Sequence, residues 1–556
     1  MSKSVFTRII ASIIMLCLLA GCVSCSSDTQ MTGDGTTEEA GGTSEDSSEA
    51  VAPGLLRVGW NRDTIMTDVH RVKGSYLFLL NLYDTLFVTR RDDNGDTYLE
   101  PRLATDYTVS GDGLTYSFTL RDDVKFCDGT PMTAEDVEYT FTRMLTLPDS
   151  VQTDFGESIL GAADCMAHKT DKLEGIRVID DTHIDITLSR PVAGYVQMLA
   201  APSCAVMSKA FTKAAGNRYG TSPEQTCGTG AYMLTEISDS RYVLELNPYY
   251  WGDIPSAERI EIYRLEPVRM ADGLLENRFD IINSTDISDE IINTISDAEE
   301  WSGHTVSIIP MGLNMLFMNM ADNRLKDVRI RRAIQLGIDR DAIIREAYGN
   351  KAVTIDGLFP RGLYGYSESN EGWLKYDPEE AVRLLTEAGA YGKLELQIAA
   401  EAEKGSQYYK ILTMIRDNLT DIGINAKLVN YDSKSFTYLR RQGRLEAYLT
   451  SWEADYNDPD SFIYTFFGSV ENTVSRSLNY SDLTVIGRVG AAKAIMDEPK
   501  RLAEYADLEK KIVREDAALV PLVQAEVRYF CGDRISGFTP YWAGWGSLYF
   551  KDVELK

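Results

Sequence analysis

Apolar and polar residues alternate along the chain with two different periods, and each period predicts one kind of element. An apolar residue at every second position is typical of a strand with one buried face. Strands are predicted on this basis at residues 55–60, 113–120 and 446–450. Two further pairs of such segments flank short turns and predict hairpins: 176–179 with 183–188, and 232–237 with 242–246.

The segment that follows Thr133 has the period of a helix. Thr133 is a suitable N-cap, and Asp136 stands three residues later, where its carboxylate can complete a capping box. The apolar stripe of this helix consists of Val137, Phe141 and Met144. Three polar residues lie off the stripe and are expected to face water: Glu138, Thr142 and Arg143.

Two later helices have equally clear signals. Asp327 precedes an apolar stripe with helical spacing and is expected to cap it. Asp377 and Pro378 supply a cap and a first-position proline ahead of two acidic residues, and Gly389 predicts the end of that helix. Because strands and helices alternate throughout, the chain is predicted to form α/β lobes.

The first residues have the features of an export signal. Lys3 and Arg8 are positive, and residues 9–19 form an apolar run that is too short to span a bilayer comfortably. Leu19-Ala20-Gly21-Cys22 matches the lipobox of bacterial lipoproteins at all four positions. We therefore predict a lipoprotein signal peptide over 1–21, cleaved before Cys22, whose thiol becomes lipidated. The alternatives are an ordinary signal peptide with a chance cysteine, and an anchor helix.

Residues 22–52 are predicted to be a disordered tether, because they are rich in Ser, Thr, Gly, Asp and Glu and contain almost nothing to bury. The predicted location is the outer face of the bacterial cytoplasmic membrane, facing a periplasm if the cell has an outer membrane. The body, residues 53–556, is too long for one small core and predicts two or three lobes.

The charge balance narrows the range of partners. The chain carries 84 acidic and 56 basic residues, a net charge of −28. This disfavours nucleic acid, because phosphate binding needs clustered lysine and arginine. It also disfavours direct adhesion to anionic lipid. The simplest consequence of the charge is solubility.

Cysteine and histidine suggest neither a metal site nor a catalytic site. The 4 histidines are scattered, and the spacings of the 8 cysteines resemble no metal site. The sequence contains no G-x-S-x-G, H-E-x-x-H or G-x-x-x-x-G-K-[ST] motif. We therefore predict no catalytic residue, no metal and no cofactor. Disulfide pairing is left open among six cysteines: Cys25, Cys127, Cys165, Cys204, Cys227 and Cys531.

Several longer motifs carry a resemblance to a known family. The most specific is DGLTYSFTLRDDVKFCDGTPMTAEDV, which is followed in order by GTGAY, NPYYWGD, DVRIRRAIQLGIDRDAII, YDPEEAVRLLTEAG and REDAALVPL. With this set the chain resembles the bacterial extracellular solute-binding proteins of family 5, which include the dipeptide- and oligopeptide-binding lipoproteins of ABC importers. The resemblance extends over nearly the whole mature chain.

The resemblance implies an α/β architecture of the type 2 periplasmic-binding-protein kind. Two hinged lobes would enclose a ligand when they close, and an extra domain would be inserted in the first lobe. Carried over to this sequence, the first lobe comprises 53–83, 215–312 and 521–556. The inserted domain comprises 84–214, and the second lobe 313–520.

The resemblance also implies where a ligand binds. Residues 451–462, SWEADYNDPDSF, follow a predicted strand, and such strand-to-loop transitions bind ligands in α/β sheets. In similar peptide-binding proteins the Asp of a W-x-x-D element pairs with the α-amino group of the peptide. Trp452 and Asp455 match that element, and Tyr456 is expected beside them. The alternative is that Asp455 only caps the loop and Trp452 belongs to the core.

Further contacts are less well defined. Lys73 and Gly74 lie where similar proteins supply main-chain hydrogen bonds to the peptide, although an ordinary surface loop is equally compatible with this segment. Lys404 is the candidate partner for the peptide carboxylate, because it falls near the position of an arginine in dipeptide-binding relatives, but the local sequence departs from theirs. Three aromatic residues near the C-terminus are expected in a lobe core rather than at the cleft: Tyr541, Trp542 and Trp545.

The function implied is that of a non-catalytic receptor. It would capture peptides by lobe closure and deliver them to ABC transporter permease subunits in the membrane to which its lipid anchors it. Three alternatives stay open. The same scaffold could bind a metal chelate, an oligosaccharide or another amine. The protein could sense peptides without transport. It could also be a lipid-anchored hydrolase, although no nucleophile–base pair is visible.

Overall fold

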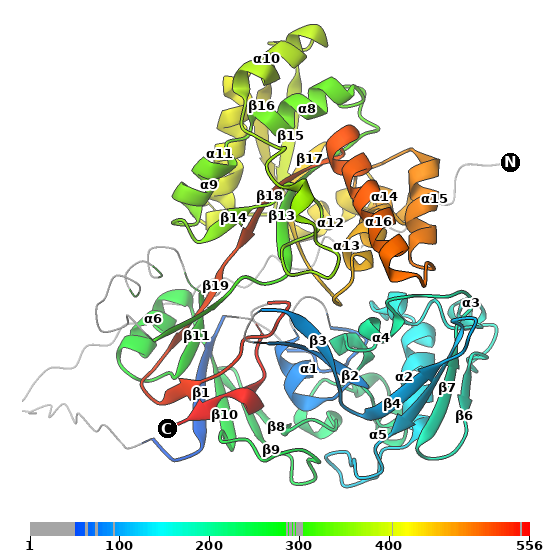
Figure 1. Cartoon of the computed structure of the whole chain (residues 1–556). Helices are drawn as coiled ribbons and strands as arrows, with labels where there is room; N and C mark the ends of the chain where they lie inside the picture. Colours follow the sequence, from blue (N-terminus) through cyan, green and yellow to red (C-terminus); the bar gives the residue numbers. More distant parts are fainter. Residues whose placement is uncertain are drawn as a thin grey trace, which may run out of the picture. The chain divides into compact units, whose positions relative to one another are not determined.

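Three larger β-sheets, of seven, six and four strands, organise the computed structural model of the chain (Figure 1). The structure describes residues 51–61, 65–72, 76–92, 95–284, 287, 292, 295, 304–402, 404–544 and 547–556. The described chain from Ala52 onwards belongs to one compact unit. Two ribbons accompany the larger sheets: β2 (Phe87–Arg91) with β3 (Thr97–Pro101), and β20 (Ile535–Gly537) with β21 (Glu554–Leu555).

The seven-stranded sheet joins segments that are far apart in the sequence. Its strand order is β12 (Thr305–Ile308), β19 (Val527–Cys531), β11 (Ile281–Asn283), β1 (Leu55–Trp60), β10 (Arg259–Arg264), β9 (Arg241–Leu246) and β8 (Tyr232–Ile237). β1 is parallel to both of its neighbours, β10 and β11. The first strand of the chain therefore lies inside the sheet, and the late strand β19 pairs with β11 and β12.

The six-stranded sheet is built mainly from the second half of the chain. Its order is β14 (Ala352–Thr354), β18 (Leu519–Ala525), β13 (Gly312–Met318), β17 (Ala447–Glu453), β15 (Glu395–Ala400) and β16 (Asn425–Asn430). Four helices pack around it (Figure 1): α8 (Val328–Gly337), α9 (Arg340–Ala347), α10 (Pro378–Glu387) and α11 (Gln407–Asp421). β18 crosses residue 520, the predicted end of the second lobe, and the division into lobes and an inserted domain stays a prediction.

The four-stranded sheet has a hydrophobic core of its own. Its order is β4 (Ala104–Val109), β5 (Thr115–Leu120), β7 (His183–Thr187) and β6 (Ile176–Val178). α2 (Ala134–Thr146) buries the predicted stripe of Val137, Phe141 and Met144 in this core. Residues 451–467 contribute one aromatic residue to the same core, Tyr456.

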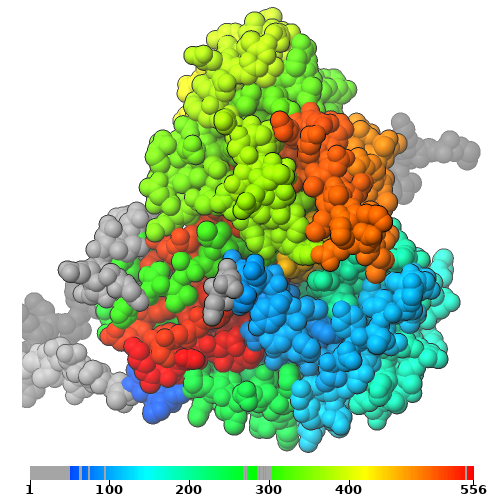
Figure 2. All heavy atoms as spheres, in the orientation of Figure 1, coloured from blue at the N-terminus to red at the C-terminus, as the bar shows by residue number. Residues whose placement is uncertain are grey.

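The remaining helices are short. They are α1 (Leu77–Leu82), α3 (Ala162–Met166), α4 (Tyr195–Met198), α5 (Lys209–Ala215), α6 (Pro267–Leu275), α12 (Ser433–Arg441), α13 (Asp460–Phe467), α14 (Val470–Ser475), α15 (Leu483–Ala492) and α16 (Glu498–Glu509). In the space-filling view, the orange part of the chain around α15 and α16 meets the blue and cyan part that contains β2 to β5 (Figure 2). The amide of Ala193 donates to the Lys493 carbonyl across this boundary at 2.8 Å.

Most elements predicted from local sequence are confirmed. Both hairpins form, as β6 with β7 and β8 with β9. Thr133 and Asp136 complete the capping box of α2, and Asp327 and Asp377 cap α8 and α10 through their side chains. Gly389 has a φ of 69° just beyond α10, a left-handed conformation that ends a helix readily at glycine.

One local prediction is confirmed with a different end, and one is wrong. The strand predicted at 446–450 forms as β17, but it continues from Ala447 to Glu453, so Trp452 lies in the strand and not in the loop. Arg143 does not face water, because its side chain is only 8% exposed. Its guanidinium forms a two-pronged ion pair with the buried carboxylate of Asp68, at 2.8 and 2.7 Å. A partner 75 residues away in sequence thus overrides the local polar pattern.

Several predictions lie outside the described residues. These are the signal peptide, nearly all of the tether with Cys22 and Cys25, Lys73, Gly74 and Trp545. Among the residues that the structure describes, no helix combines the length and apolar character needed to cross a bilayer. Within the same residues, no group of three or more His, Cys, Asp or Glu side chains is placed to hold a metal ion.

Candidate ligand-binding site

A cavity of about 840 Å³ lies beside the end of β17. Its wall comes mainly from three stretches: Val72 and Tyr76 ahead of α1, residues 151–157, and residues 451–476. This volume is within the range of small-molecule sites, roughly 300–1,000 Å³. A second cavity, beside Arg102, has only about 20 Å³, room for about one water molecule, so the larger cavity is the candidate site.

The carboxylate of Asp455 reaches this cavity from the residues just after β17. Its backbone N–H donates to the hydroxyl of Ser461 at 2.9 Å, which fixes the main chain. Within the described residues its carboxylate has no hydrogen-bond or ion-pair partner, and the residue is half-buried in the cavity wall. Burial, together with the nearby charge of Asp154, raises the pKa of Asp455 to about 7, while Arg476 opposes this shift. Such a group gains from a cation that enters the cavity.

Arg476 adds a positive charge to the same wall. Its guanidinium lies over the ring of Trp452, 4.8 Å from the centroid, and Tyr448 donates to its carbonyl oxygen at 2.7 Å. Among the described residues no carboxylate forms an ion pair with it. Burial, and then the charge of Arg440, lower the pKa of Arg476. The cavity therefore presents both a carboxylate and a guanidinium that lack ion-pair partners.

Two other acids and one lysine complete the polar wall. Burial raises the pKa values of Asp154 and Glu157, and the charge of Lys493 opposes both shifts. Lys493 itself is satisfied, because its ammonium lies 3.3 Å from Asp460 and 3.8 Å from the ring centroid of Tyr464. Its charge is thus shared within the protein and less available to a ligand.

Trp452 and Tyr456 are partly core and partly cavity wall. The indole N–H of Trp452 donates to the Ser461 carbonyl at 3.0 Å, and its ring packs edge-on against Phe466. The hydroxyl of Tyr456 donates to Asp460 at 3.0 Å. Both residues line the cavity beside Asp455. The structure therefore brings these three predicted residues together. Trp452 packs on the core and also lines the cavity.

Residues 98–473 match the family model described as bacterial extracellular solute-binding proteins, family 5 Middle. The chain belongs to this family. It is 28% identical over 429 residues to the periplasmic oligopeptide-binding protein OppA of Escherichia coli, and the match covers 74% of this chain and 76% of that protein.

Solved structures share the fold, that of the type 2 periplasmic binding proteins. NikA from Brucella suis in complex with Fe(III)-EDTA matches with a TM-score of 0.78 at 22% identity, covering 90% of this chain and 100% of that one. DppA from Helicobacter pylori in complex with the peptide STSA matches with a TM-score of 0.73 at 22% identity, covering 90% and 98%. The same fold thus occurs with different ligands in these two proteins.

The other predicted site residues of this family 5 protein are placed differently. Lys404 is exposed in the turn before α11, and it is not one of the residues that line the cavity. Lys73 and Gly74 fall outside the described residues, but Val72 and Tyr76 on either side line the cavity. Tyr541 and Trp542 are buried in the core, at 2% and 3% exposure, as predicted.

Sequence analysis missed Arg476, Asp154 and Glu157. One signal for Arg476 was available, because it is the sole basic residue between Arg444 and Arg488, in a stretch rich in aromatic and acidic residues. Asp154 and Glu157 carried no comparable signal. They belong to a loop whose position beside β17 follows from the packing of distant segments.

Proposed function

We propose that this solute-binding protein is a lipid-anchored receptor that captures short peptides and delivers them to an ABC importer. The observation that carries the proposal is the Asp455 carboxylate, which has no ion-pair partner among the described residues and faces a ligand-sized cavity. The names of relatives support the peptide class, since these include oligopeptide-, dipeptide- and di/tripeptide-binding proteins.

The proposed ligand contacts follow from the charges of the wall. Asp455 pairs with the α-ammonium of the peptide, because an enclosed ammonium without a counter-charge is costly. Arg476 pairs with an anionic group of the ligand, either its carboxylate or an acidic side chain, and takes the part for which Lys404 was predicted. Trp452 and Tyr456 supply apolar contact. Lys73 and Gly74 remain proposed donors and acceptors for the peptide main chain.

Closure is proposed to work as a population shift. The cavity wall combines residues of the predicted first lobe, the predicted inserted domain and the predicted second lobe, represented by Tyr76, Asp154 and Asp455. A ligand that contacts all three stabilises the arrangement in which they are close together. Free ligand should therefore raise the thermal stability of the protein in a concentration-dependent way.

The wall also bears on the alternative ligands. Among the residues that the structure describes, five acidic and three basic residues line the cavity: Asp154, Glu157, Glu453, Asp455, Glu471, Arg441, Arg476 and Lys493. An excess of carboxylates disfavours a multiply anionic metal chelate, which would need a cationic wall. A neutral oligosaccharide would leave Asp455 and Arg476 unpaired. A zwitterionic peptide satisfies both groups.

Native mass spectrometry tests the ligand class directly. The full chain is released from membranes in mild detergent without refolding, and a co-purified peptide is expected, with fragmentation giving its sequence. The matched control is Asp455→Asn prepared in the same way, which should carry much less peptide. A co-purified chelate or sugar would contradict the proposal, as would fragments produced by turnover of an added peptide.

The anchor and the transport role are tested in cells. Cys22→Ala should abolish acyl labelling and either release the protein from membranes or block its processing. Unchanged acyl labelling would show that Cys22 is not the lipidated residue. Loss of peptide uptake in a strain that lacks the protein supports transport, whereas intact uptake with a lost response to peptide would favour the sensor.

A further inference from the structure

Two cysteines from distant parts of the sequence lie together at the edge of one hydrophobic core. Cys127 is in the turn between β5 and α2, where it is partly buried, and Cys227 is in the segment before β8, where it is 1% exposed. The amide of Cys127 donates to the carbonyl of Gly228 at 2.9 Å, and its thiol lies 3.9 Å from the carbonyl oxygen of Thr226. The two thiols lie close enough to affect each other's pKa, which is lowered for Cys127 and raised for Cys227.

The backbone around Cys227 packs closely against the end of α1, which fixes the position of this cysteine. A Cβ atom on Gly228 would lie 2.1 Å from the Leu82 carbonyl oxygen, and one on Gly230 would lie 2.5 Å from the carbonyl carbon of Leu82. The segment that carries Cys227 is therefore pressed against the end of α1. The main-chain hydrogen bond from Cys127 to Gly228 holds the first segment beside the residue that follows Cys227.

The other described cysteines have no such neighbour. Cys204 donates to the Met198 carbonyl, Cys531 lies beside its own strand at the Tyr529 carbonyl, and Cys165 is buried without a thiol contact among the described residues. These three serve as internal references, because each is enclosed by protein but not placed opposite a second sulfur.

We propose that Cys127 and Cys227 form a disulfide in the exported protein. The sulfur–sulfur bond forms as two thiols lose two protons and two electrons. The electrons pass to the disulfide of a thiol–disulfide oxidant, either glutathione disulfide or an oxidase that carries a reactive disulfide, which is reduced to two thiols. Such bonds persist in extracytoplasmic compartments. Formation in the cell therefore rests on the export that the proposed function includes, whereas the pairing itself rests on geometry alone.

The environment sets the order of the exchange. The contact with Cys227 lowers the pKa of Cys127, and the same contact, together with burial, raises the pKa of Cys227. Cys127 is also the more accessible of the two. Its thiolate therefore attacks the oxidant first and forms a mixed disulfide, after which the Cys227 sulfur attacks the Cys127 sulfur and displaces the oxidant as a thiolate.

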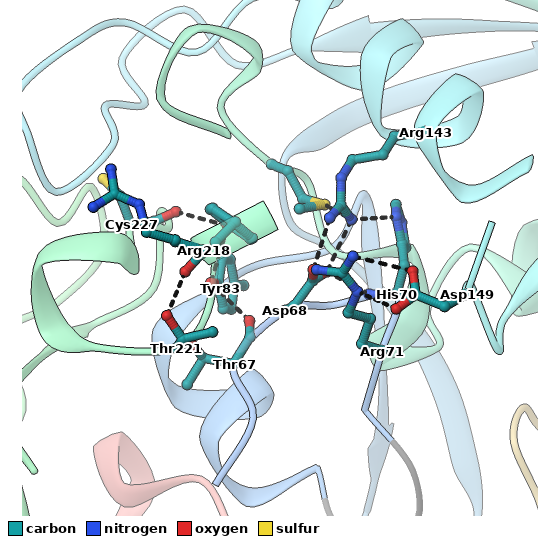
Figure 3. Close-up of polar contacts among 12 residues, drawn as sticks. Thr67, Asp68, His70, Arg71, Tyr83, Arg143, Asp149, Arg218, Thr221 and Cys227 are labelled. Carbon is teal, nitrogen blue, oxygen red and sulfur yellow. Dashed lines mark hydrogen bonds and ion pairs between the residues drawn. The ribbon is translucent and has the colours of Figure 1, made fainter. Parts of the chain in front are cut away.

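The bond would stabilise the frame behind the ligand cavity. The Tyr219 hydroxyl lies 3.3 Å from the Cys227 carbonyl oxygen and 3.0 Å from the Tyr83 hydroxyl, and Tyr83 donates to Thr67 (Figure 3). Thr67 adjoins Asp68, which holds Arg143 of α2. The link would thus lock together the two segments that supply Val72 and residues 151–157 to the cavity.

Peptide mapping tests the pairing. The purified full chain is equilibrated with a mixture of reduced and oxidised glutathione, its remaining thiols are alkylated, and it is digested with trypsin without reduction. The expected product joins residues 126–143 to residues 219–241, each of which contains one cysteine, and it separates on reduction. Cys165, Cys204 and Cys531 should instead be alkylated. Alkylation of Cys127 and Cys227 after this treatment would overturn the proposal.

Thermal unfolding provides the second measurement. Reduction should lower the melting temperature of the wild type by about 3–8 °C, because the bond closes a long loop in the unfolded chain. Cys127→Ala and Cys227→Ala should each lose this response to reductant. The melting temperature of the double variant should not fall below the value expected from adding the packing losses of the two single variants. Cys165→Ala, the matched control, should keep the response.

The outcome is independent of ligand binding. Calorimetry with a peptide on the same oxidised sample reports the proposed function separately. A linked pair in a protein that binds no peptide would contradict that function alone, whereas free thiols in a peptide-binding protein would contradict only the disulfide. A pair that links in glutathione but is found reduced in protein taken from cells would show that the chain does not reach an oxidising compartment.

Discussion

Two carboxylates of this protein differ in how their charge is balanced. Asp68 is fully buried, and Arg143 binds both of its oxygens, while Arg71 and the amide of His70 add hydrogen bonds at 3.1 and 3.2 Å (Figure 3). Asp455 is half-buried beside the cavity, and its carboxylate has no ion-pair or hydrogen-bond partner within the described residues. The first carboxylate is paired within the fold, and the second is the one that we propose for a ligand.

The difference between the two carboxylates is whether a partner within the protein balances the charge. A buried charge is tolerated when it is paired and hydrogen-bonded, and it otherwise costs stability. Burial and Arg143 lower the pKa of His70 well below its usual value and keep the imidazole neutral, so His70 does not change the charge of the Asp68 cluster near neutral pH. Asp455 has a pKa raised to about 7, so near neutral pH its ionisation responds to a charged group that enters the cavity.

The largest expected effect is on the structural side. Arg143→Met removes the main partner of Asp68 and should lower the free energy of unfolding by about 3–5 kcal/mol, since a buried charge is left poorly compensated. Denaturant unfolding measures it. The control is Arg177→Met, which breaks the surface pair with Asp185, where the arginine side chain is 75% exposed, and should cost less than about 1 kcal/mol.

If Arg143→Met does not fold, Arg143→Lys serves instead, because it keeps the charge and loses the two-pronged geometry. A loss no larger than that of Arg177→Met would mean that the Asp68 cluster does not stabilise the fold, and the comparison with Asp455 would fail.

The next effect is on the functional side. Asp455→Asn keeps the shape and removes the charge, and it should weaken peptide binding by roughly 2–5 kcal/mol, or about 30- to 4,000-fold. Acetylating the peptide amine should cost the wild type a similar amount and cost the variant much less, because both changes delete one interaction. Calorimetry on the four combinations gives the coupling.

Glu471→Gln is the matched control, because it neutralises another carboxylate of the same wall. It should change affinity far less and leave the penalty for acetylation intact. Strictly additive losses for Asp455→Asn and acetylation would mean that Asp455 does not contact the amine.

Arg476 sharpens the comparison from the opposite charge. Arg476→Gln should weaken peptides that carry the recognised anionic group by about 10- to 100-fold, the value of a charged hydrogen bond. Peptides in which that group is amidated should bind both proteins alike. Arg476→Lys should restore the affinity only in part, because lysine lacks the planar group that lies on Trp452.

Arg441→Gln, at an exposed position of the wall, is the control for a general loss of positive charge. An equal effect of Arg441→Gln and Arg476→Gln on every peptide would show that the wall attracts anions without a specific contact at Arg476.

The smallest predicted effect is a pH dependence of binding. Asp455 pairs with an ammonium only when ionised, so with its pKa raised to about 7 affinity should be full above pH 7 and fall as pH decreases, by about tenfold per unit at most. The upper limit comes from the peptide amine, which loses its proton at about pH 8. Asp455→Asn should flatten the profile below pH 7.

Neighbouring groups define the control for this profile. Asp154 and Glu157 also have raised pKa values. Arg476 and Lys493 oppose the shift of Asp154, and Lys493 and Arg190 oppose that of Glu157. Asp154→Asn should move the midpoint to lower pH, because it removes the negative charge that helps to hold the pKa of Asp455 up. A pH profile that is unchanged in Asp455→Asn would assign the dependence to these other acids.

Local sequence was sufficient wherever the determinants of an element lie within a few residues. Thr133 with Asp136, and Asp377 with Glu380, specify helix starts through hydrogen bonds that span three residues. The two hairpins likewise depend on adjacent segments. The W-x-x-D element was found because Trp452 and Asp455 are close in sequence as well as in space.

Local sequence failed where a residue's partner is distant. The apolar stripe of α2 predicted that Arg143 faces water, because no residue near it in sequence indicates a buried aspartate 75 positions away. The contact between Cys127 and Cys227 was equally hidden, since six cysteines allow many pairings. Asp154 and Arg476 joined Asp455 through the packing of separate segments around one cavity.

The sequence by itself determined the α/β character, the helix caps, the hairpins and the family, because these depend on short-range hydrogen bonds, on side-chain periodicity and on motifs in a fixed order. Tertiary structure alone decided which charges are paired. Pairing depends on the distances between segments, and only the packed core sets these distances. Two aspartate side chains of one chain can therefore differ in whether a partner balances their charge. Asp68 is paired with Arg143, whereas the Asp455 carboxylate has no ion-pair partner within the described residues.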